Sequence, residues 1–332
     1  MNRALITGGT GFVGKHLVPF LQQRGSQVAV LAQACCVDIA NVNWYEADIR
    51  DEQAVRSAVR DFKPAHIYHL AAISAVDFSW NNPRLTYEVN VFGTLNVIQA
   101  AINLPTPVRI LNVSTAQVYA PSSLALTETS SLNPENPYAA SKAMAEFLRV
   151  QFRKSSKGGV ITARSFNHTG PGQSTDFVLS SMAKQFAEIE AGLRDPKLVM
   201  GNIHVKRDFT DVRDVVEAYA LLLEKGEVNE SYNVCSGRAR SIEELIREFE
   251  SLTGIQVEIQ TDPNRQRIGE NDFVCGSLEK IKATTGWEPK IPLRSTLHDV
   301  LSYWRTVVRE NNARSACRES DESVHAFHLQ AK

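Results

Sequence analysis

The sequence predicts an α/β fold, with a doubly wound parallel sheet and a second, smaller α/β domain. Through about residue 165, short apolar runs alternate with stretches of helical periodicity, which is typical of a parallel sheet covered by helices on both faces. The length of 332 residues corresponds to about two domains. With 43% hydrophobic and 22% charged residues, the chain has enough apolar side chains for a large core.

The expected elements follow one another along the chain. The apolar runs predict strands at residues 3–7, 27–31, 42–46, 66–70, 109–114 and 160–164. The helical patterns between them predict helices at residues 53–62, 83–102 and 137–154. Beyond residue 165 the spacing is less regular, and helices are expected at 176–191 and 241–252. The second of these starts with the capping box Ser241-x-x-Glu244 and stops at Gly254.

Charge and cysteine usage exclude several classes of function. Thirty-six Lys and Arg residues against 37 Asp and Glu residues give a net charge of −1, so no broad positive field draws the protein to nucleic acid or to an anionic membrane. The N-terminus enters a strand at once and no apolar run is long enough to span a bilayer, so a cytoplasmic protein is expected. The five cysteines have no CxxC spacing, which predicts reduced thiols and no metal site.

A glycine-rich segment follows the first strand and leads directly into a helical pattern. It reads Thr7-Gly8-Gly9-Thr10-Gly11-Phe12-Val13-Gly14. Its spaced glycines allow a tight turn, close approach of the backbone to a pyrophosphate, and tight packing of helix on strand. Because the segment lies at the strand-to-helix junction of the first βαβ unit, it predicts a dinucleotide site in a Rossmann-type fold. The cofactor-binding residues expected here are Gly8, Thr10, Gly11, Phe12, Val13 and Gly14.

Tyr138 and Lys142 stand four residues apart on a predicted helix, so both side chains share one face. Asn136 is expected as the N-cap of this helix and Pro137 as its first residue. The Lys142 cation, the positive helix N-terminus and an oxidised cofactor each act to lower the pKa of the Tyr138 phenol. The pair is therefore expected to be catalytic, with Tyr138 transferring a proton and Lys142 adjusting the pKa of the Tyr138 phenol. An ion-bearing surface helix is the other interpretation.

The end of the second strand bears on the choice of cofactor. Enzymes that use NAD place a carboxylate there, on the ribose 2′-hydroxyl. This sequence has Ala32 and Gln33 at that point, so no carboxylate repels a 2′-phosphate and NADP(H) is favoured. An Arg that would bind the phosphate is absent as well, and Asp38 lies somewhat too far along the chain, so NAD(H) remains open.

Several motifs together resemble those of the extended short-chain dehydrogenase/reductase family, which includes NAD-dependent epimerases and dehydratases. The resemblance covers residues 3 to about 305. In chain order the motifs are TGxxGxxG at residues 7–14, Asp48-Ile49-Arg50, His69-Leu70-Ala71-Ala72, Asn90-Val91-x-Gly93-Thr94 and Tyr138-x-x-x-Lys142.

This resemblance implies roles for residues outside the glycine-rich segment. Asp48 and Ile49 would hold the adenine, and the stretch Leu70–Ala72 would line the path of the cofactor's phosphates and ribose. Thr115 stands at the hydroxyl position of the family's catalytic triad, where it would hydrogen-bond the reacting oxygen. The structural interpretation of Ala71 and Ala72 alone is core packing.

On the substrate side, the segment from Arg164 to Ser174 resembles one shared by GDP-mannose 4,6-dehydratases and GDP-4-keto-6-deoxy-D-mannose reductases. The resemblance implies that Asn167 holds the nucleotide sugar. It also implies that Arg207 and Arg267 lie on its pyrophosphate, where a planar guanidinium can bind phosphate oxygens in bidentate fashion. Arg265 is an alternative to Arg267.

Two further substrate candidates have structural interpretations as well. Lys184 either borders the diphosphate or base or belongs to a solvated helix face. Ser74 follows the fourth strand, where a parallel sheet presents its C-terminal edge to ligands, and it either meets a hexose hydroxyl or joins a local turn network.

Gln117 separates two reactions of this group of enzymes. The dehydratases carry a Glu two residues after the catalytic Thr, and an amide cannot exchange a proton as that carboxylate does. The resemblance therefore implies NADPH-dependent reduction of the C4 ketone of GDP-4-dehydro-6-deoxy-D-mannose to GDP-D-rhamnose. A nucleotide-sugar 4-epimerase, a 4,6-dehydratase of the same family and a non-catalytic NADP-binding sensor are the alternatives.

The motifs divide the chain into three parts. Residues 1–165 are expected to form the dinucleotide-binding domain, with residues 205–235 returning to it, and residues 166–308 the sugar-nucleotide domain. Periodicity is lost beyond about residue 308, which predicts a mobile tail at 309–332. The helices at 83–102 and 137–154 correspond to those that build the dimer contact in the resembling family, so a homodimer is expected.

Overall fold

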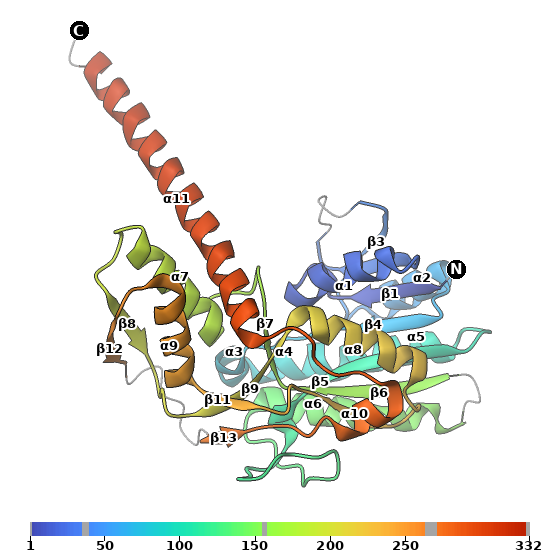
Figure 1. The fold of residues 1–332 in the computed structure, drawn as a ribbon. Helices are drawn as coiled ribbons and strands as arrows, with labels where there is room; N and C mark the ends of the chain where they lie inside the picture. Colours follow the sequence, from blue (N-terminus) through green and yellow to red (C-terminus); the bar gives the residue numbers. More distant parts are fainter. Residues whose placement is uncertain (1, 35–39, 155–157, 263–270, 330–332) are drawn as a thin grey trace. The chain divides into compact units, whose positions relative to one another are not determined.

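The computed structural model describes residues 2–34, 40–154, 158–262 and 271–329 (Figure 1). The chain divides into two compact units, each discontinuous in sequence. The first unit comprises Met1–His168, Val205–Arg240 and Asn271–Ile291. The second comprises Thr169–His204, Ser241–Glu270 and Pro292–Lys332.

The first unit is built on a seven-stranded sheet in the order β10-β6-β5-β4-β1-β2-β3. Every neighbouring pair in it is parallel. The strands are β1 (Arg3–Thr7), β2 (Gln27–Ala32), β3 (Val42–Glu46), β4 (His66–His69), β5 (Val108–Thr115), β6 (Gly158–Ser165) and β10 (Ser231–Val234). The strand order reverses between β1 and β4, which is the doubly wound arrangement, and the predicted fold class is confirmed.

Alternate residues of the strands pack into two separate cores, one on each face of the sheet. Ile6 of β1 belongs to one cluster of buried residues, and Leu5 belongs to a second. The helices that contribute to the first cluster include α1 (Phe12–Gln23) and α8 (Val212–Lys225), and those of the second include α2 (Glu52–Phe62) and α5 (Gly93–Ile102) (Figure 1).

The turn between β1 and α1 requires glycine for two different reasons. Gly8 has φ +69°, and a Cβ on it would lie 2.8 Å from the backbone N and Cα of Ala71. A Cβ on Gly14 would lie 2.4 Å from the carbonyl oxygen of Gly9. At the start of α1, the N-cap Gly11 makes no side-chain capping hydrogen bond. The backbone at Gly8 therefore lies against the segment that follows β4, and the backbone at Gly14 lies against Gly9. Neither position has room for a side chain.

Replacing Gly14 by Ala is expected to lower the stability of the protein by about 3 kcal/mol, since the added methyl overlaps backbone atoms that cannot rotate away. Thermal unfolding measures the loss. The matched control is Gly25→Asn, because Gly25 has φ +76° with open space around it and Asn tolerates this conformation. Equal unfolding midpoints for the wild-type protein and Gly14→Ala would contradict the proposed close packing.

Two predicted helices each contain a change of helical type. The helix expected at 83–102 consists of α4 (Pro83–Tyr87), a π-helical segment η1 (Glu88–Phe92) and α5. The helix expected at 137–154 consists of α6 (Pro137–Phe147) and a 3₁₀ segment η3 (Leu148–Lys154). A π-helical turn inside a longer helix often marks a functional site.

The smaller elements of the fold complete the chain. A second sheet has the order β11-β9-β13, with β7 also pairing with β9, and a third consists of β12 and β8. These strands are β7 (Asn167–Thr169), β8 (Lys197–Met200), β9 (Lys206–Asp211), β11 (Ala239–Ser241), β12 (Glu258–Thr261) and β13 (Phe273–Val274). The remaining short helices are α3 (Val76–Asn81), η2 (Ala116–Val118) and α10 (Glu279–Thr285).

Three helices dominate the second unit: α7 (Val178–Glu190), α9 (Ile242–Thr253) and α11 (Leu293–Leu329). The predicted cap of α9 is confirmed, since Ser241 Oγ accepts from the Glu244 N–H at 3.0 Å and Gly254 ends the helix at φ +73°. Helix α11 continues to Leu329, through most of the segment 309–332 where a mobile tail is expected. In the described ranges no helix is both long and apolar enough to cross a membrane.

Candidate active site

The predicted catalytic residues come together at the end of β5 and the start of α6. Thr115 is the last residue of β5, and Tyr138 and Lys142 lie on α6. The predicted cap is confirmed, because Asn136 Oδ1 accepts from the Ala139 N–H at 2.8 Å and Pro137 is the first helical residue. The cap fixes where α6 begins, and so fixes the position of Tyr138 in its first turn.

Tyr138 is half-buried and shares a side-chain hydrogen bond with Thr115. Burial raises the pKa of the Tyr138 phenol, and the Thr115 hydrogen bond opposes this only in part. The direction of this shift is opposite to the one expected from the sequence, because desolvation of the phenol is its largest cause. The phenol is held in its protonated form.

Lys142 is almost fully buried on the same face of α6, one turn after Tyr138. Burial lowers the pKa of its ammonium to about 8, and the Glu146 carboxylate one turn further on opposes the shift. A buried cation of this kind titrates close to neutral pH, where an ordinary lysine does not. Lys142 is accordingly a group whose charge can change within the working range of an enzyme.

Behind Lys142 lies a buried ion pair that the sequence did not reveal. Glu146 and Arg164 are 1% and 6% exposed, with Arg164 Nη2 2.8 Å from Glu146 Oε2. Ser114 Oγ donates to Glu146 Oε1 at 2.5 Å. Glu146 continues the four-residue spacing of Tyr138 and Lys142, and that spacing was the available signal.

The backbone of Tyr138 is held by two buried serines. Its N–H donates to Ser79 Oγ of α3 at 3.2 Å, and its carbonyl accepts from Ser141 Oγ at 2.7 Å. Ser141 in turn accepts from Asn90 Nδ2 at 2.9 Å, and Asn90 lies on the π-helical segment η1. Asn90 also binds both the N–H and the carbonyl of Ile73, after β4. The sequence did not predict these positioning contacts.

The ends of β1 and β4 are joined beside the glycine-rich turn. His69 is fully buried, with Nδ1 2.7 Å from Thr7 Oγ1 and Nε2 2.8 Å from Thr94 Oγ1. Burial lowers the pKa of His69 to about 3, so the ring stays neutral. Thr7 Oγ1 also accepts from the Ala71 N–H at 3.2 Å. This network holds the predicted cofactor segment Leu70–Ala72 against the loop at Gly8.

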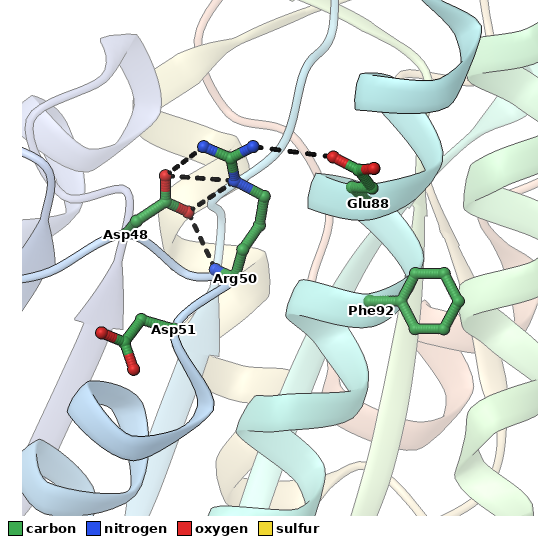
Figure 2. Close-up of a pocket in the computed structure, with 5 residues that line it drawn as sticks. All are labelled: Asp48, Arg50, Asp51, Glu88 and Phe92. Atoms are coloured by element: carbon green, nitrogen blue, oxygen red, sulfur yellow. Dashed lines mark hydrogen bonds and ion pairs between the residues drawn. The ribbon is translucent and has the colours of Figure 1, made fainter.

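Asp48 lies in an open cavity of about 500 Å³, lined by Asp48, Arg50, Asp51, Glu88 and Phe92 (Figure 2). Its carboxylate accepts from the Arg50 side chain at 2.6 Å and from Gln33 Nε2 at 2.9 Å. The Arg50 hydrogen bond is the main cause that lowers the pKa of Asp48 to about 2. The neighbouring Ile49 is buried and packs into the second core. Gln33 at the end of β2 is thus tied to Asp48.

The predicted substrate residues are spread over both units. In the first unit, Ser74 and Asn167 are exposed, and Arg207 on β9 is partly buried, with Nη1 donating to the Lys206 carbonyl. Lys184 belongs to α7 of the second unit, where it pairs with Glu188 and lies over the Trp304 ring. Arg265 and Arg267 lie outside the described residues, as do Cys35, Cys36 and Asp38.

Three features of this structure agree with one family of enzymes. They are the glycine loop, the sheet topology and the group formed by Thr115, Tyr138 and Lys142. The chain matches the family described as GDP-mannose 4,6 dehydratase over residues 5–300. It belongs to that family. The predicted resemblance is thereby confirmed, and the protein is an extended short-chain dehydrogenase/reductase that modifies a nucleotide sugar with a nicotinamide cofactor.

Within and around the GDP-mannose 4,6 dehydratase family, the chain is similar to enzymes of several activities. It is 37% identical over 311 residues to the GDP-6-deoxy-D-mannose reductase of Pseudomonas aeruginosa, which covers 93% of this chain and 99% of the relative. The structure of RMD from Pseudomonas aeruginosa complexed with NADPH has a TM-score of 0.81 at 35% identity, over 92% of this chain and 99% of that one. The UDP-glucose 4-epimerase of Thermus thermophilus in complex with NAD has a TM-score of 0.79 at 31% identity. The match covers 91% of this chain and 99% of that one.

The residues of this member of the GDP-mannose 4,6 dehydratase family fit a bound dinucleotide. The turn at Gly8 and Gly14 leaves no space for side chains, and the first amides of α1 are not capped by a side chain. Free amides at a helix N-terminus, next to a bare backbone turn, bind phosphate groups. Among the described residues, no cluster of three or more His, Cys, Asp or Glu side chains is placed to hold a metal ion.

Proposed function

We propose that the protein reduces the C4 ketone of GDP-4-dehydro-6-deoxy-D-mannose to give GDP-D-rhamnose, with NADPH as the reductant. The observation that carries this proposal is the hydrogen-bonded Thr115 and Tyr138 pair above a buried Lys142, with an amide at Gln117. An amide cannot shuttle the proton that a dehydration needs, whereas a ketone reduction needs only one proton donor. The similarity to the Pseudomonas reductase supports the same choice.

In this proposal each of the three residues has its own part in the reaction. The nicotinamide, when bound, supplies a hydride to the C4 carbon. Tyr138 gives its phenolic proton to the C4 oxygen, and its raised pKa keeps that proton in place until the oxygen becomes basic. Thr115 donates a hydrogen bond to the same oxygen, and Lys142 stabilises the phenolate and binds the ribose next to the nicotinamide.

For the cofactor, we propose that the loop Gly8–Gly14 binds the pyrophosphate and that Asp48 and Ile49 hold the adenine. Leu70, Ala71 and Ala72 are proposed to line the path of the cofactor's phosphates and ribose. NADP(H) is proposed because the residues at the end of β2, Ala32 and Gln33, include no carboxylate of their own to bind the ribose 2′-hydroxyl. Gln33, which occupies this place, donates to Asp48 at 2.9 Å. For the substrate, Asn167, Arg207 and Arg267 are proposed to bind the sugar nucleotide, with Ser74 as a further hexose contact.

The decisive experiment couples the protein to an independent GDP-mannose 4,6-dehydratase. GDP-mannose, the dehydratase and NADPH are mixed with the protein, and absorbance at the nicotinamide band is followed. Loss of NADPH with formation of a 6-deoxyhexose nucleotide is the expected result. Absence of cofactor consumption would refute the reductase proposal, and release of tightly bound NAD from the denatured protein would favour a 4-epimerase instead.

We predict that kcat/KM for reduction falls as the pH rises through about 8. Burial places the pKa of Lys142 near that value, so its charge is present below pH 8 and is lost above it. The neutral amine no longer stabilises the Tyr138 phenolate, while Tyr138 itself stays protonated because burial raises its pKa. Initial rates between pH 6 and 10 give the profile. A flat profile through pH 9 would show that the Lys142 charge does not matter.

We further propose a homodimer formed through α4, α5 and α6. Exposed apolar side chains on the contacting segments η1, α6 and η3 support this, namely Phe92, Met144, Phe147 and Val150. Light scattering is expected to give twice the chain mass of 36.8 kDa. Phe147→Glu is expected to shift the mass toward the monomer, because it places a charge in an apolar contact. A wild-type monomer would contradict the proposal.

A further inference from the structure

A row of polar side chains crosses four adjacent strands of the seven-stranded sheet. Thr7 of β1 pairs in register with His69 of β4, His69 pairs with Asn112 of β5, and Asn112 pairs with Thr162 of β6. Each of these four residues is at most 1% exposed. The row two residues earlier on the same face is apolar and belongs to the second core, namely Leu5, Ile67, Ile110 and Val160. The polar row is therefore a layer inside the fold.

The two halves of this polar row differ in their hydrogen bonds. Thr7 and His69 bond to each other, and the second ring nitrogen of His69 bonds to Thr94. In the other half, Asn112 Nδ2, Asn112 Oδ1 and Thr162 Oγ1 are buried and have no hydrogen-bond partner in the described part of the chain. Buried amides and hydroxyls of folded proteins are nearly always bonded, either to protein or to ordered water. The Asn112 half of the row therefore calls for a partner from outside the chain.

The chemistry of the unpartnered atoms limits what that partner can be. Asn112 Nδ2 only donates, Asn112 Oδ1 only accepts, and the Thr162 hydroxyl can do either. A cation would bind Oδ1 and leave Nδ2 unpaired, whereas an anion would bind Nδ2 and leave Oδ1 unpaired. A water molecule both donates and accepts, and a buried water typically makes about three hydrogen bonds. Water is thus the ligand that can satisfy both ends of the amide and the hydroxyl.

We infer that Asn112 and Thr162 bind a buried water molecule between β5 and β6. The next row on the same face consists of Ser114 and Arg164, which pair in register and both bond to the Glu146 carboxylate. The water site is therefore bordered by the His69 network on one strand and by the Glu146 ion pair on the next row. With the water in place, the two groups form one continuous polar layer.

Thr162→Val tests the inference through the sign of a stability change. The substitution keeps the shape of the side chain and removes its hydroxyl. If a water bridges Thr162 and Asn112, the water loses a partner, and the midpoint temperature of unfolding is expected to fall by roughly 2–4 °C. If the site is dry, the substitution removes an unpaired buried hydroxyl and the midpoint should rise.

Thr210→Val is the matched control for this measurement. Thr210 Oγ1 is also buried without a partner among the described residues, but Thr210 lies on β9 of the second sheet, away from Asn112. A single hydroxyl offers too few bonds to hold a buried water. The control is therefore expected to unfold at the wild-type temperature or above it. A Thr162→Val midpoint equal to or above that of the control would overturn the inference.

The double variant Asn112→Val with Thr162→Val tests for the water itself. It removes all the unpartnered polar atoms of the row, so the water has no bond left to make and should leave. Magnetic relaxation dispersion of water deuterons counts long-lived internal water molecules, and the double variant is expected to hold fewer than the wild type. Equal counts would overturn the inference. So would a wild-type crystal structure in which Asn112 bonds directly to Thr162 with no water between them.

Discussion

Tyr138→Phe is expected to lower the rate of reduction by about 10³-fold while leaving cofactor binding unchanged. The substitution removes the phenolic oxygen that shares a hydrogen bond with Thr115 and keeps the aromatic ring. A positioned general acid contributes about 10² to 10⁴ in rate, and no other acid in the described part of α6 takes its place on this face. Single-turnover reduction and fluorescence titration with NADPH measure the two quantities separately.

The control for this experiment is Thr115→Val, which removes the partner of the phenol and keeps the shape of the side chain. A smaller loss, of about 10-fold to 100-fold, is expected, because Tyr138 retains its proton and loses only its alignment. If Tyr138→Phe keeps most of the activity, the proton comes from another group and the proposed mechanism is wrong. If both variants lose cofactor binding, the effect is structural.

Arg164→Leu is expected to destabilise the protein by about 3–5 kcal/mol. Glu146 is 1% exposed, and removing its ion-pair partner leaves a carboxylate in the protein interior with the Ser114 hydroxyl as a donor and the Lys142 cation one helical turn away. The guanidinium also donates to the Tyr119 hydroxyl at 3.0 Å and to the Glu128 carbonyl at 3.1 Å, and these acceptors lose a donor as well. The midpoint temperature of thermal unfolding should fall by roughly 6–10 °C.

The double variant Glu146→Leu with Arg164→Leu is the matched control. It removes both charges, and apolar groups of similar volume can replace a buried ion pair at little cost. We expect it to recover most of the stability that the single variant loses. Single and double variants of equal stability would mean that the unpaired carboxylate is not the cause. Recovery of stability without recovery of activity would assign Glu146 to the environment of Lys142.

Much of the fold followed from short-range patterns. The six predicted strands are all present to within two residues at either end, because each is a short apolar run bounded by turn residues, and all but β3 have mostly buried residues. The seventh strand, β10, was not predicted. Its four residues include Ser231 and Asn233, and a buried polar residue such as Asn233 becomes understandable only through its contacts with Glu128 and Tyr119, more than 100 residues away.

The residues of the candidate site also divide into those that short-range patterns predict and those that they do not. The glycine segment, Tyr138, Lys142 and the cap at Asn136 were predictable, since each depends on spacing within one turn or one helix. The contacts of Ser79 and Asn90 with α6 were not, because they join segments separated by about 50 residues or more. The pKa of Tyr138 was predicted in the wrong direction, since its burial depends on the whole fold.

The discontinuity of the first unit has a consequence for the folding of the chain during its synthesis. Strand β6 ends at Ser165, but its outer neighbour β10 begins only at Ser231, after the whole of Thr169–His204 has been made. At about 5–20 residues per second, the edge of β6 stays unpaired for several seconds on the ribosome. Exposed strand edges invite pairing with other chains. A protein shortened before Ser231 is therefore expected to aggregate rather than to form a smaller domain.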